Sequence, residues 1–261
     1  MKSSIERRME IVRVVNQDGR SRVDSLATKY GVSSVTIRSD LVFLEKKRLI
    51  IRTHGAAISN TGIIPELTVH EKLHQNTEIK SLVGLAAAKL IESGDTIILD
   101  SGTTIREVSR SIRGIDNLVV MTNSLDVAID LTPEAKIELL MTGGALRKNS
   151  LSLFGPQAEN SLKNYRFDKV FLGVDGFDIK AGITTHNEYE ANLNRLMCEI
   201  SDQVIVVADS TKFGKRSCHI IREFGNIDIL ITDSGIPEDY LKSLREMKVE
   251  VIVTGNGSVT S

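Results

Sequence analysis

The stretch "VSSVTIRSDLVFLEKKRLIIRTHGAA", residues 32–57, decides how the N-terminal part of this chain folds. Ser33 can cap a helix whose apolar residues Ile37, Leu41 and Leu44 recur at helical spacing and form one buried face. Beyond this helix, two short apolar runs lie on either side of a polar tip at residues 53–55. The stretch therefore predicts a helix followed by a small β wing.

Two further helices are predicted upstream. Residues 21–31, "SRVDSLATKYG", predict a short helix that ends at Gly31, because glycine readily adopts the left-handed conformation that closes a helix. Before it, apolar residues recur at helical spacing in "SSIERRMEIVRVV", namely Ile5, Met9, Val12 and Val15. The short helix, the turn and the helix that begins at Ser33 form a helix-turn-helix unit, and the second helix of such a unit fits the major groove of DNA.

The outward face of the second helix has the side chains that such a role needs. Arg38 can reach a phosphate or a guanine edge, and Val35 can contact a thymine methyl group. Short hydroxyl side chains flank them, and the wing adds a cation and an imidazole. The predicted DNA-contacting residues are Ser34, Val35, Thr36, Arg38, Ser39, Arg52 and His54.

The charge distribution supports this interpretation. The whole chain has a net charge of −1, but residues 1–56 contain twelve Lys or Arg against six Asp or Glu, and the remainder contains 21 against 28. A basic segment attracts DNA phosphates, whereas an acidic remainder disfavours indiscriminate binding.

The remainder of the chain alternates helical patterns with short β-rich runs. Residues 58–78 are polar, contain turn-forming residues and predict a linker; residues 79–261 predict helices around a mostly parallel sheet. The expected fold class is α/β, with an N-terminal helix-turn-helix and a C-terminal α/β domain.

Polar residues follow the predicted strands. In open α/β sheets, ligands bind beyond the carboxyl ends of the strands, and here these ends carry "DSGTT" at 100–104, "MTNS", "MTGG", "GVDG" and "VADSTKFGK". "DSGTT" stands where a strand passes into a helix, and the N-terminus of a helix favours a phosphate group. Lys212 offers a cation after a later strand.

These motifs resemble the DeoR family of bacterial transcriptional repressors. The stretch 32–57 contains the Ser-x-x-Thr-Ile-Arg-x-Asp-Leu-x-x-Leu core of the family, although Arg48 and Ala56 stand where glycine is usual, and the strand ends from "ILDSGTT" to "VVADSTKFGK" resemble its sensor domain. Such sensors are related in fold to ribose-5-phosphate isomerase. The ligand-binding residues that the resemblance implies are Asp100, Ser101, Gly102, Thr103, Thr104, Asn123, Gly143, Gly144, Asp175, Asn187, Glu188 and Lys212.

The resemblance also implies a function. It divides the chain into a winged helix-turn-helix DNA-binding domain (1–57), a linker (58–78) and a phosphosugar-sensing domain (79–261). We expect a repressor of a sugar or amino-sugar catabolic operon, most similar to regulators of N-acetylgalactosamine or galactosamine use, that a phosphorylated sugar releases from its operator. A homo-oligomer is expected, as dimer or tetramer, because paired half-sites multiply affinity.

Other features narrow the class of protein. No apolar run is long enough for a membrane span, and the N-terminus has no signal region, so we expect a cytoplasmic protein without a membrane partner. No cofactor motif and no cluster of metal ligands is present, so no cofactor is expected.

Two alternatives remain open from the sequence. The C-terminal domain can be a phosphosugar isomerase with a DNA-binding head, in which the carboxylates of Asp175, Asp178 and Glu188 act in acid–base catalysis. Against this, "IKAGITTHNE" has one glycine where isomerases have several after a lysine. The second alternative is a redox or metal sensor that uses Cys198 and Cys218.

Overall fold

The structure is a computed structural model that describes residues 3–18, 20–47, 49–53, 55–59, 66–179 and 181–255. Contacts divide the chain into two compact units, residues 1–66 and 67–261. Each unit has a hydrophobic core of its own.

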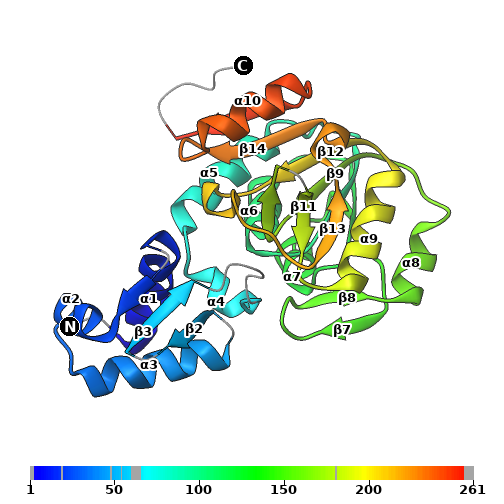
Figure 1. Cartoon of the computed structure of the whole chain (residues 1–261). Coiled ribbons are helices and arrows are strands. Elements are labelled where there is room, and N and C mark those ends of the chain that lie inside the picture. The colour runs from blue at the N-terminus through cyan, green and yellow to red at the C-terminus, as the bar shows by residue number, and fades with distance from the viewer. Residues whose placement is uncertain are drawn as a thin grey trace. The chain divides into compact units, whose positions relative to one another are not determined.

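The N-terminal unit packs three helices on a small antiparallel sheet (Figure 1). Its strands pair in the order β1-β3-β2. Its elements are α1 (Ser4–Asp18), β1 (Arg20–Arg22), α2 (Val23–Tyr30), α3 (Ser34–Lys46), β2 (Ile50–Thr53) and β3 (Ala56–Ser59). The predicted helix-turn-helix and the two wing strands are confirmed, whereas β1 was not predicted because three residues are too short to show a period.

Local chemistry explains the turn between α2 and α3. Gly31 ends α2 in the left-handed conformation, with φ 62°, and the hydroxyl of Ser33 caps α3 by accepting a hydrogen bond from the backbone nitrogen of Thr36 at 3.1 Å. Both ends therefore close as the sequence predicts.

The core of this unit contains the predicted face of α3. Ile37, Leu41 and Leu44 are fully buried and pack with Ile11 and Val15 of α1. The apolar stripe of α1 is displaced from the predicted one, since its first two members, Ile5 and Met9, are 68% and 38% exposed. The first two turns of α1 extend past the small core, so spacing alone does not determine burial there.

The second unit is built on a parallel sheet of seven strands in the order β15-β14-β12-β9-β4-β5-β6. The strands are β4 (Thr96–Leu99), β5 (Leu118–Thr122), β6 (Ile137–Met141), β9 (Phe167–Gly173), β12 (Ser201–Val207), β14 (Ile229–Asp233) and β15 (Glu250–Thr254). The predicted α/β class and the parallel sheet are confirmed.

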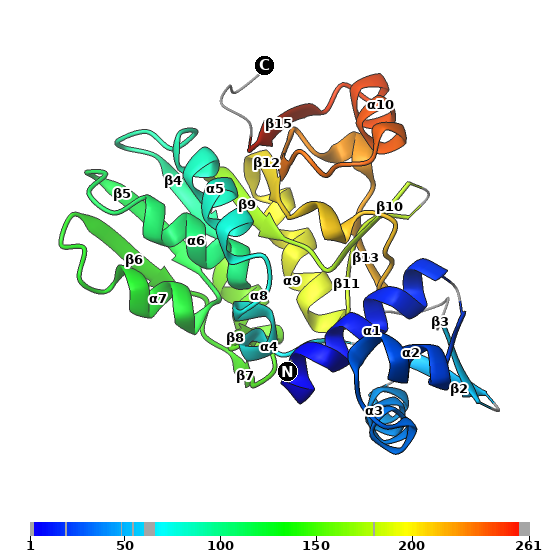
Figure 2. The ribbon, with the colours of Figure 1, turned by 90° about the vertical axis from the view of Figure 1, so that its left-hand side faces the viewer.

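Helices cover both faces of this sheet. One core lies under α5, α6 and α7, which stand side by side in Figure 2, and the other lies under α8, α9 and α10. Neighbouring residues of β4 separate into the two cores, because successive side chains of a strand point to opposite faces. The helices are α5 (Thr77–Ala88), α6 (Thr103–Ser111), α7 (Leu125–Leu131), α8 (Pro156–Leu162), α9 (Glu188–Glu199) and α10 (Glu238–Glu246).

Smaller elements lie beyond the strand ends. An antiparallel sheet joins β10, β11 and β13, a hairpin joins β7 and β8, and short helices follow β12 and precede α5. Their bounds are α4 (Val69–Leu73), β7 (Ala145–Arg147), β8 (Ser152–Phe154), β10 (Gly176–Asp178), β11 (Gly182–Thr185), η1 (Ser210–Lys212), β13 (His219–Arg222) and η2 (Phe224–Asn226).

Two features of this arrangement bear on the site. The strand order reverses between β4 and β9, since the chain proceeds from β4 outward to β6 and then returns to the other side of β4. A crevice at the carboxyl ends of such strands is the usual ligand site of this architecture. In addition, the predicted linker 58–78 includes α4, which packs into the second unit through Val69, a residue only 3% exposed.

Candidate nucleic-acid interface and anion-binding crevice

The outward face of α3 is free of core packing. Val35 is 72% exposed, and Arg38 and Ser39 are exposed beside it. Ser34 is half-buried, and the hydroxyl of Thr36 lies 2.9 Å from that of Ser33 within the helix cap. The structure thus brings the predicted α3 residues to one accessible face, although Thr36 also has a structural role.

Asp40 anchors the same helix from its inner side. Its two carboxylate oxygens accept hydrogen bonds from the Nε atoms of Arg7 and Arg8, each at 2.7 Å, and its side chain is buried. The Arg8 guanidinium also lies 4.1 Å from the ring centre of Phe43. This charge network holds α3 against α1, and it was missed because the spacing of a lone Asp on a helix does not reveal its partners.

Of the two predicted wing residues, the structure describes only Arg52. Arg52 pairs with Glu45 of α3, with Nε 2.6 Å from Oε2, and this hydrogen bond lowers the pKa of Glu45. Both side chains are accessible and exposed ion pairs are weak, so this pair does not prevent Arg52 from contacting a phosphate. His54 lies outside the described residues, as does Arg48.

In the second unit, β4 ends in the predicted anion site. Gly102 has φ 114°, a Cβ atom there would meet nothing within 4 Å, and it precedes the first helical residues of α6, Thr103 and Thr104. The first backbone N–H groups of a helix have no partner within the helix, and the helix dipole favours an anion there. Space is open on the side of Gly102 where a Cβ atom would stand, next to this helix end.

Lysines gather beside this helix end. Lys80 of α5 lies one turn before Gly84, which packs against Glu107 of α6, so Lys80 is level with the first turn of α6. Burial lowers the pKa of Lys80 to about 8; Asp209 opposes this shift, whereas Lys212 and Lys72 add to it. Lys80 is 5% exposed.

Lys212 belongs to the same cluster. Burial lowers its pKa, as does the neighbouring charge of Lys72, while Asp175 and Asp209 raise it. Lys212 is partly exposed, so the lysine cluster can be reached from solvent. The interacting charges here are four lysines and three carboxylates, which leaves one excess positive charge within an otherwise acidic unit; they are Lys72, Lys80, Lys212 and Lys215 against Asp175, Asp209 and Glu107.

Asp175, at the end of β9, is the centre of a polar network. It accepts hydrogen bonds from the Nζ of Lys72 at 2.7 Å and from the hydroxyl of Thr185 at 3.1 Å, and it lies 2.8 Å from the Nδ1 of His186. Burial by itself would raise the pKa of Asp175, but Lys72 and His186 hold it well below its ordinary value. The aspartate is therefore ionised, and both of its carboxylate oxygens have hydrogen-bond partners.

A serine completes a Ser-His-Asp sequence of contacts here, but its geometry is not that of a catalytic triad. The Oγ of Ser217 lies 3.5 Å from Nδ1 and 3.4 Å from Nε2 of His186. Because the lone pairs of the two ring nitrogens point in different directions, an oxygen equidistant from both lies on neither axis. His186 is thus not placed to take the proton of Ser217.

Uncharged and acidic groups line the other part of the strand ends. Asp100, buried at the end of β4, accepts hydrogen bonds from the Nδ2 of Asn194 and the backbone nitrogen of Gly173, both at 3.3 Å. Burial raises the pKa of Asp100 to about 7, and Glu190 adds to this shift. Buried amide atoms of Asn123 and of Asn194 have no hydrogen-bond partner among the described residues. Such atoms can bind ligand hydroxyl groups.

Glu190 was missed by the sequence. It is buried on α9 and accepts hydrogen bonds from the hydroxyls of Ser150 at 2.6 Å and Ser152 at 2.9 Å, with Arg147 at 3.4 Å. Only the tertiary fold brings the β7–β8 hairpin to α9. Lys72, Lys80, Asp209, His186 and Asn194 were missed for the same reason.

Other predicted ligand residues have local structural roles. A Cβ atom on Gly144 would lie 2.5 Å from the carbonyl oxygen of Phe154, so this glycine permits the β7–β8 hairpin to close. Asn187 caps α9 by accepting hydrogen bonds from two backbone nitrogens, at 3.0 and 3.2 Å. Glu188 is exposed, and Gly143 has φ 66° next to the side chain of Gln157.

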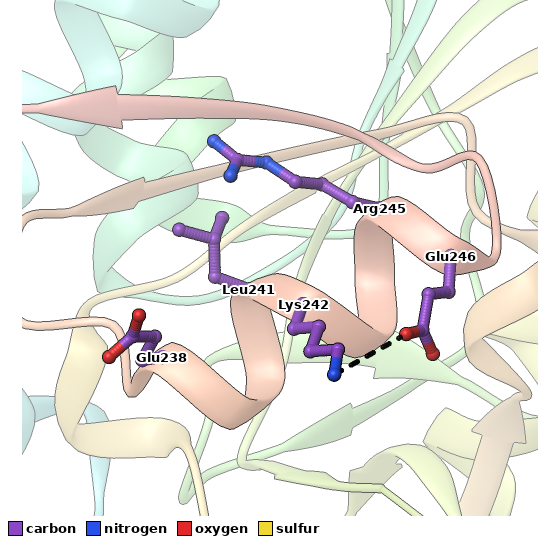
Figure 3. Close-up of a pocket in the computed structure, with 5 residues that line it drawn as sticks. All are labelled: Glu238, Leu241, Lys242, Arg245 and Glu246. Carbon is purple, nitrogen blue, oxygen red and sulfur yellow. Dashed lines mark ion pairs between the residues drawn. The ribbon is translucent and has the colours of Figure 1, made fainter.

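Metal binding, membrane insertion and surface hollows are further properties that bear on function in the described part of the chain. There, no group of three or more His, Cys, Asp or Glu side chains could hold a metal ion, and no helix is long and apolar enough to cross a membrane. A surface hollow lies along α10, where Lys242 and Glu246 pair at 4.0 Å (Figure 3). It contains none of the predicted residues.

Comparison with known proteins covers both units. The DeoR-like helix-turn-helix domain matches residues 7–62, and the DeoR C terminal sensor domain matches residues 75–234. A putative aga operon transcriptional repressor from Escherichia coli O157:H7 is 48% identical over 252 residues, which is 96% of this chain and 94% of the relative. The HTH-type transcriptional repressor GlcR of Bacillus subtilis is 35% identical over 256 residues, 95% of this chain and 96% of the relative.

Solved structures are more distant. Ribose 5-phosphate isomerase A from Methanocaldococcus jannaschii aligns at a TM-score of 0.40 with 17% identity, over 54% of this chain and 56% of that one. A TM-score of this size is too low for the likeness to support an assignment of function.

Proposed function

This chain belongs to the DeoR family of transcriptional regulators, and from that premise we propose that it represses a sugar or amino-sugar operon and leaves its operator when a phosphorylated sugar binds. The helix-turn-helix domain makes it a DNA-binding protein, and its relatives are named repressors. The relative named for the aga operon supports the amino-sugar class.

We assign operator recognition to the exposed face of α3. Its N-terminal residues enter the major groove, where Arg38 contacts a phosphate or a guanine edge and Val35 contacts a thymine methyl group. Repressors of this kind bind paired half-sites, which requires a dimer or a larger homo-oligomer. Because operator DNA is its partner, the proposed place of action is the cytoplasm.

The lysine cluster beside the N-terminus of α6 is the observation that carries the effector assignment. A phosphate group over Gly102 would meet the free N–H groups of α6 and the cations of Lys80 and Lys212. Its charge would offset the excess of positive charge in the crevice. The partnerless amide atoms of Asn123 and Asn194 would then bind hydroxyl groups of the sugar.

Turnover of the sugar is the less favoured alternative. Asp175 is tied up by Lys72, Thr185 and His186, and Asp178 accepts a hydrogen bond from the backbone nitrogen of Ala181 at 2.9 Å in a turn. Glu188 is exposed on the first turn of α9. The three carboxylates that an isomerase would use thus lie in different surroundings and not in one shared catalytic centre.

The experiment is a thermal-shift panel of hexose, pentose and hexosamine phosphates, each with its unphosphorylated sugar as matched control. A ligand at about 100 times its Kd adds roughly 2.7 kcal/mol of stability, so a binder should be clear in this assay. Binders are then added to operator gel shifts. The proposal predicts stabilisation and operator release by a phosphosugar alone; steady isomerisation of the same ligand, or no response to any phosphosugar, would contradict it.

A further inference from the structure

Residues 67–80 form a strap across the carboxyl edge of the sheet in the second unit. The strap consists of α4 and the start of α5; Figure 2 shows α4 beside β7 and β8, and α4 also contacts α6. The backbone nitrogen of Val69 donates to the carbonyl oxygen of Asn149 at 2.7 Å, and the Nδ2 of Asn76 donates to Asp209 at 3.1 Å. The strap therefore extends from the hairpin after β6 to the end of β12.

Lys72 fastens the middle of this strap. Its Nζ lies 2.7 Å from Asp175 Oδ1, and its side chain and that of Asp175 are 23% and 13% exposed. The carbonyl oxygen of Lys72 accepts the hydrogen bond of Lys80 Nζ at 2.7 Å. The first contact ties the strap to the end of β9, and the second, which lies within the strap, joins Lys72 to a lysine of the proposed phosphate site.

The strap is also where the DNA-binding unit is attached. The N-terminal unit ends at residue 66, and the strap begins at residue 67. Along the chain, α4 is therefore the first helix of the second unit after the wing strand β3, which ends at Ser59. No contact between the two units is needed for this connection.

We propose that the Lys72–Asp175 ion pair fastens the strap in the operator-binding form, and that the anionic group of the effector draws Lys72 away from Asp175. This inference rests on the proposed function and adds the residue that links effector binding to operator release. A phosphate dianion carries more charge than one carboxylate, and it would also relieve the repulsion between Lys72 and Lys212. The effector thereby prefers the unfastened strap, which supplies the differential affinity that coupling requires.

The test measures operator affinity in the full-length chain without any effector. Lys72→Met removes the ion pair but keeps an unbranched side chain, so operator affinity should fall at least about fivefold, toward the value of the effector-saturated wild type. Adding the effector should then weaken binding little further. Lys72→Arg retains the charge and should restore operator affinity to within about twofold of wild type.

Lys242→Met is the matched control, because it breaks an exposed lysine–carboxylate pair on α10 that belongs neither to the strap nor to the proposed effector site. It should leave effector-free operator affinity and release by effector unchanged, with melting curves confirming that every variant is folded. Wild-type operator affinity in Lys72→Met, an undiminished further release by effector, or an equal loss in Lys242→Met would each overturn the inference. A wild type that ignores all phosphosugars refutes the proposed function instead, while the effector-free measurement still tests the ion pair.

Discussion

The Oδ2 atom of Asp100 lies 3.3 Å from the backbone nitrogen of Gly173, which joins the ends of β4 and β9 where the strand order of the sheet reverses. The bond places a buried carboxyl group at the switch point, next to Glu190. Burial and this neighbour raise the pKa of Asp100 to about 7, so its charge changes near neutral pH.

Asp100→Asn should therefore change how stability depends on pH. The pKa of Asp100 is higher in the folded chain than in the unfolded chain, so its stabilising contribution is complete below about pH 4 and is lost as pH rises through about 7. The neutral amide lacks this loss. In urea unfolding, the free energy of unfolding of Asp100→Asn relative to the wild type should rise by on the order of a few kcal/mol from pH 4 to pH 8. Parallel profiles would show that Asp100 does not titrate there.

Arg38→Ala should weaken operator binding without unfolding the N-terminal unit, because Arg38 is exposed whereas Ile37, Leu41 and Leu44 form the core of that unit. Loss of one phosphate contact reduces the slope of log affinity against log salt by about one unit. Lys46→Ala, at the far end of α3, is the control, since base contacts come from the N-terminal part of a recognition helix. A salt titration in which Arg38→Ala matches the wild type would make Arg38 ordinary surface.

Thr103→Glu should produce a repressor that binds its operator and no longer responds to its effector. The new carboxylate stands at the first residue of α6, where the effector phosphate is proposed to bind, and like charges repel. Thr103→Gln, which has the same size as Thr103→Glu but no charge, is the matched control and should still respond to the effector. An unchanged effector concentration for release by folded Thr103→Glu would place the phosphate elsewhere, with Lys212 the next residue to test.

Gly144→Ala should destabilise the second unit more than Gly94→Ala. Both glycines have positive φ, 108° and 96°, but a Cβ atom at position 144 would lie 2.5 Å from the Phe154 carbonyl oxygen, whereas nothing lies within 4 Å of one at position 94. Both variants should lose about 1–3 kcal/mol of stability to backbone strain, and only Gly144→Ala also has the steric collision. Thermal unfolding of the two variants compares these costs; equal losses would mean that the hairpin shifts freely.

The two cysteines should differ in reactivity. Burial raises the pKa of Cys198 to about 11, so its thiolate is scarce, whereas Cys218 is exposed. In the native protein a thiol reagent should label Cys218 alone, and the labelled protein should bind operator and effector as before. Loss of operator binding after labelling, absent in Cys218→Ser, would instead support a redox sensor.

Much of the first unit followed from the sequence alone. The stripe Ile37, Leu41 and Leu44, the cap at Ser33 and the stop at Gly31 are local signals, because helix periodicity and end chemistry depend on residues within a few positions of one another. The parallel sheet and the polar strand ends followed for the same reason, since buried strands carry continuous apolar runs.

The contents of the crevice were decided only by the tertiary structure. Lys72 lies 103 positions before Asp175 in the chain, and Asn76 lies 133 before Asp209; these partners meet because the strand order reverses between β4 and β9 and the strap crosses the sheet edge. No periodicity encodes such pairs. Gly144 and Asn187 were predicted as ligand residues from the family resemblance, and only the structure shows that Gly144 lies in a tight hairpin and that Asn187 caps a helix. Residue type and spacing determine which elements form, whereas the packing of distant elements determines which charges share one crevice.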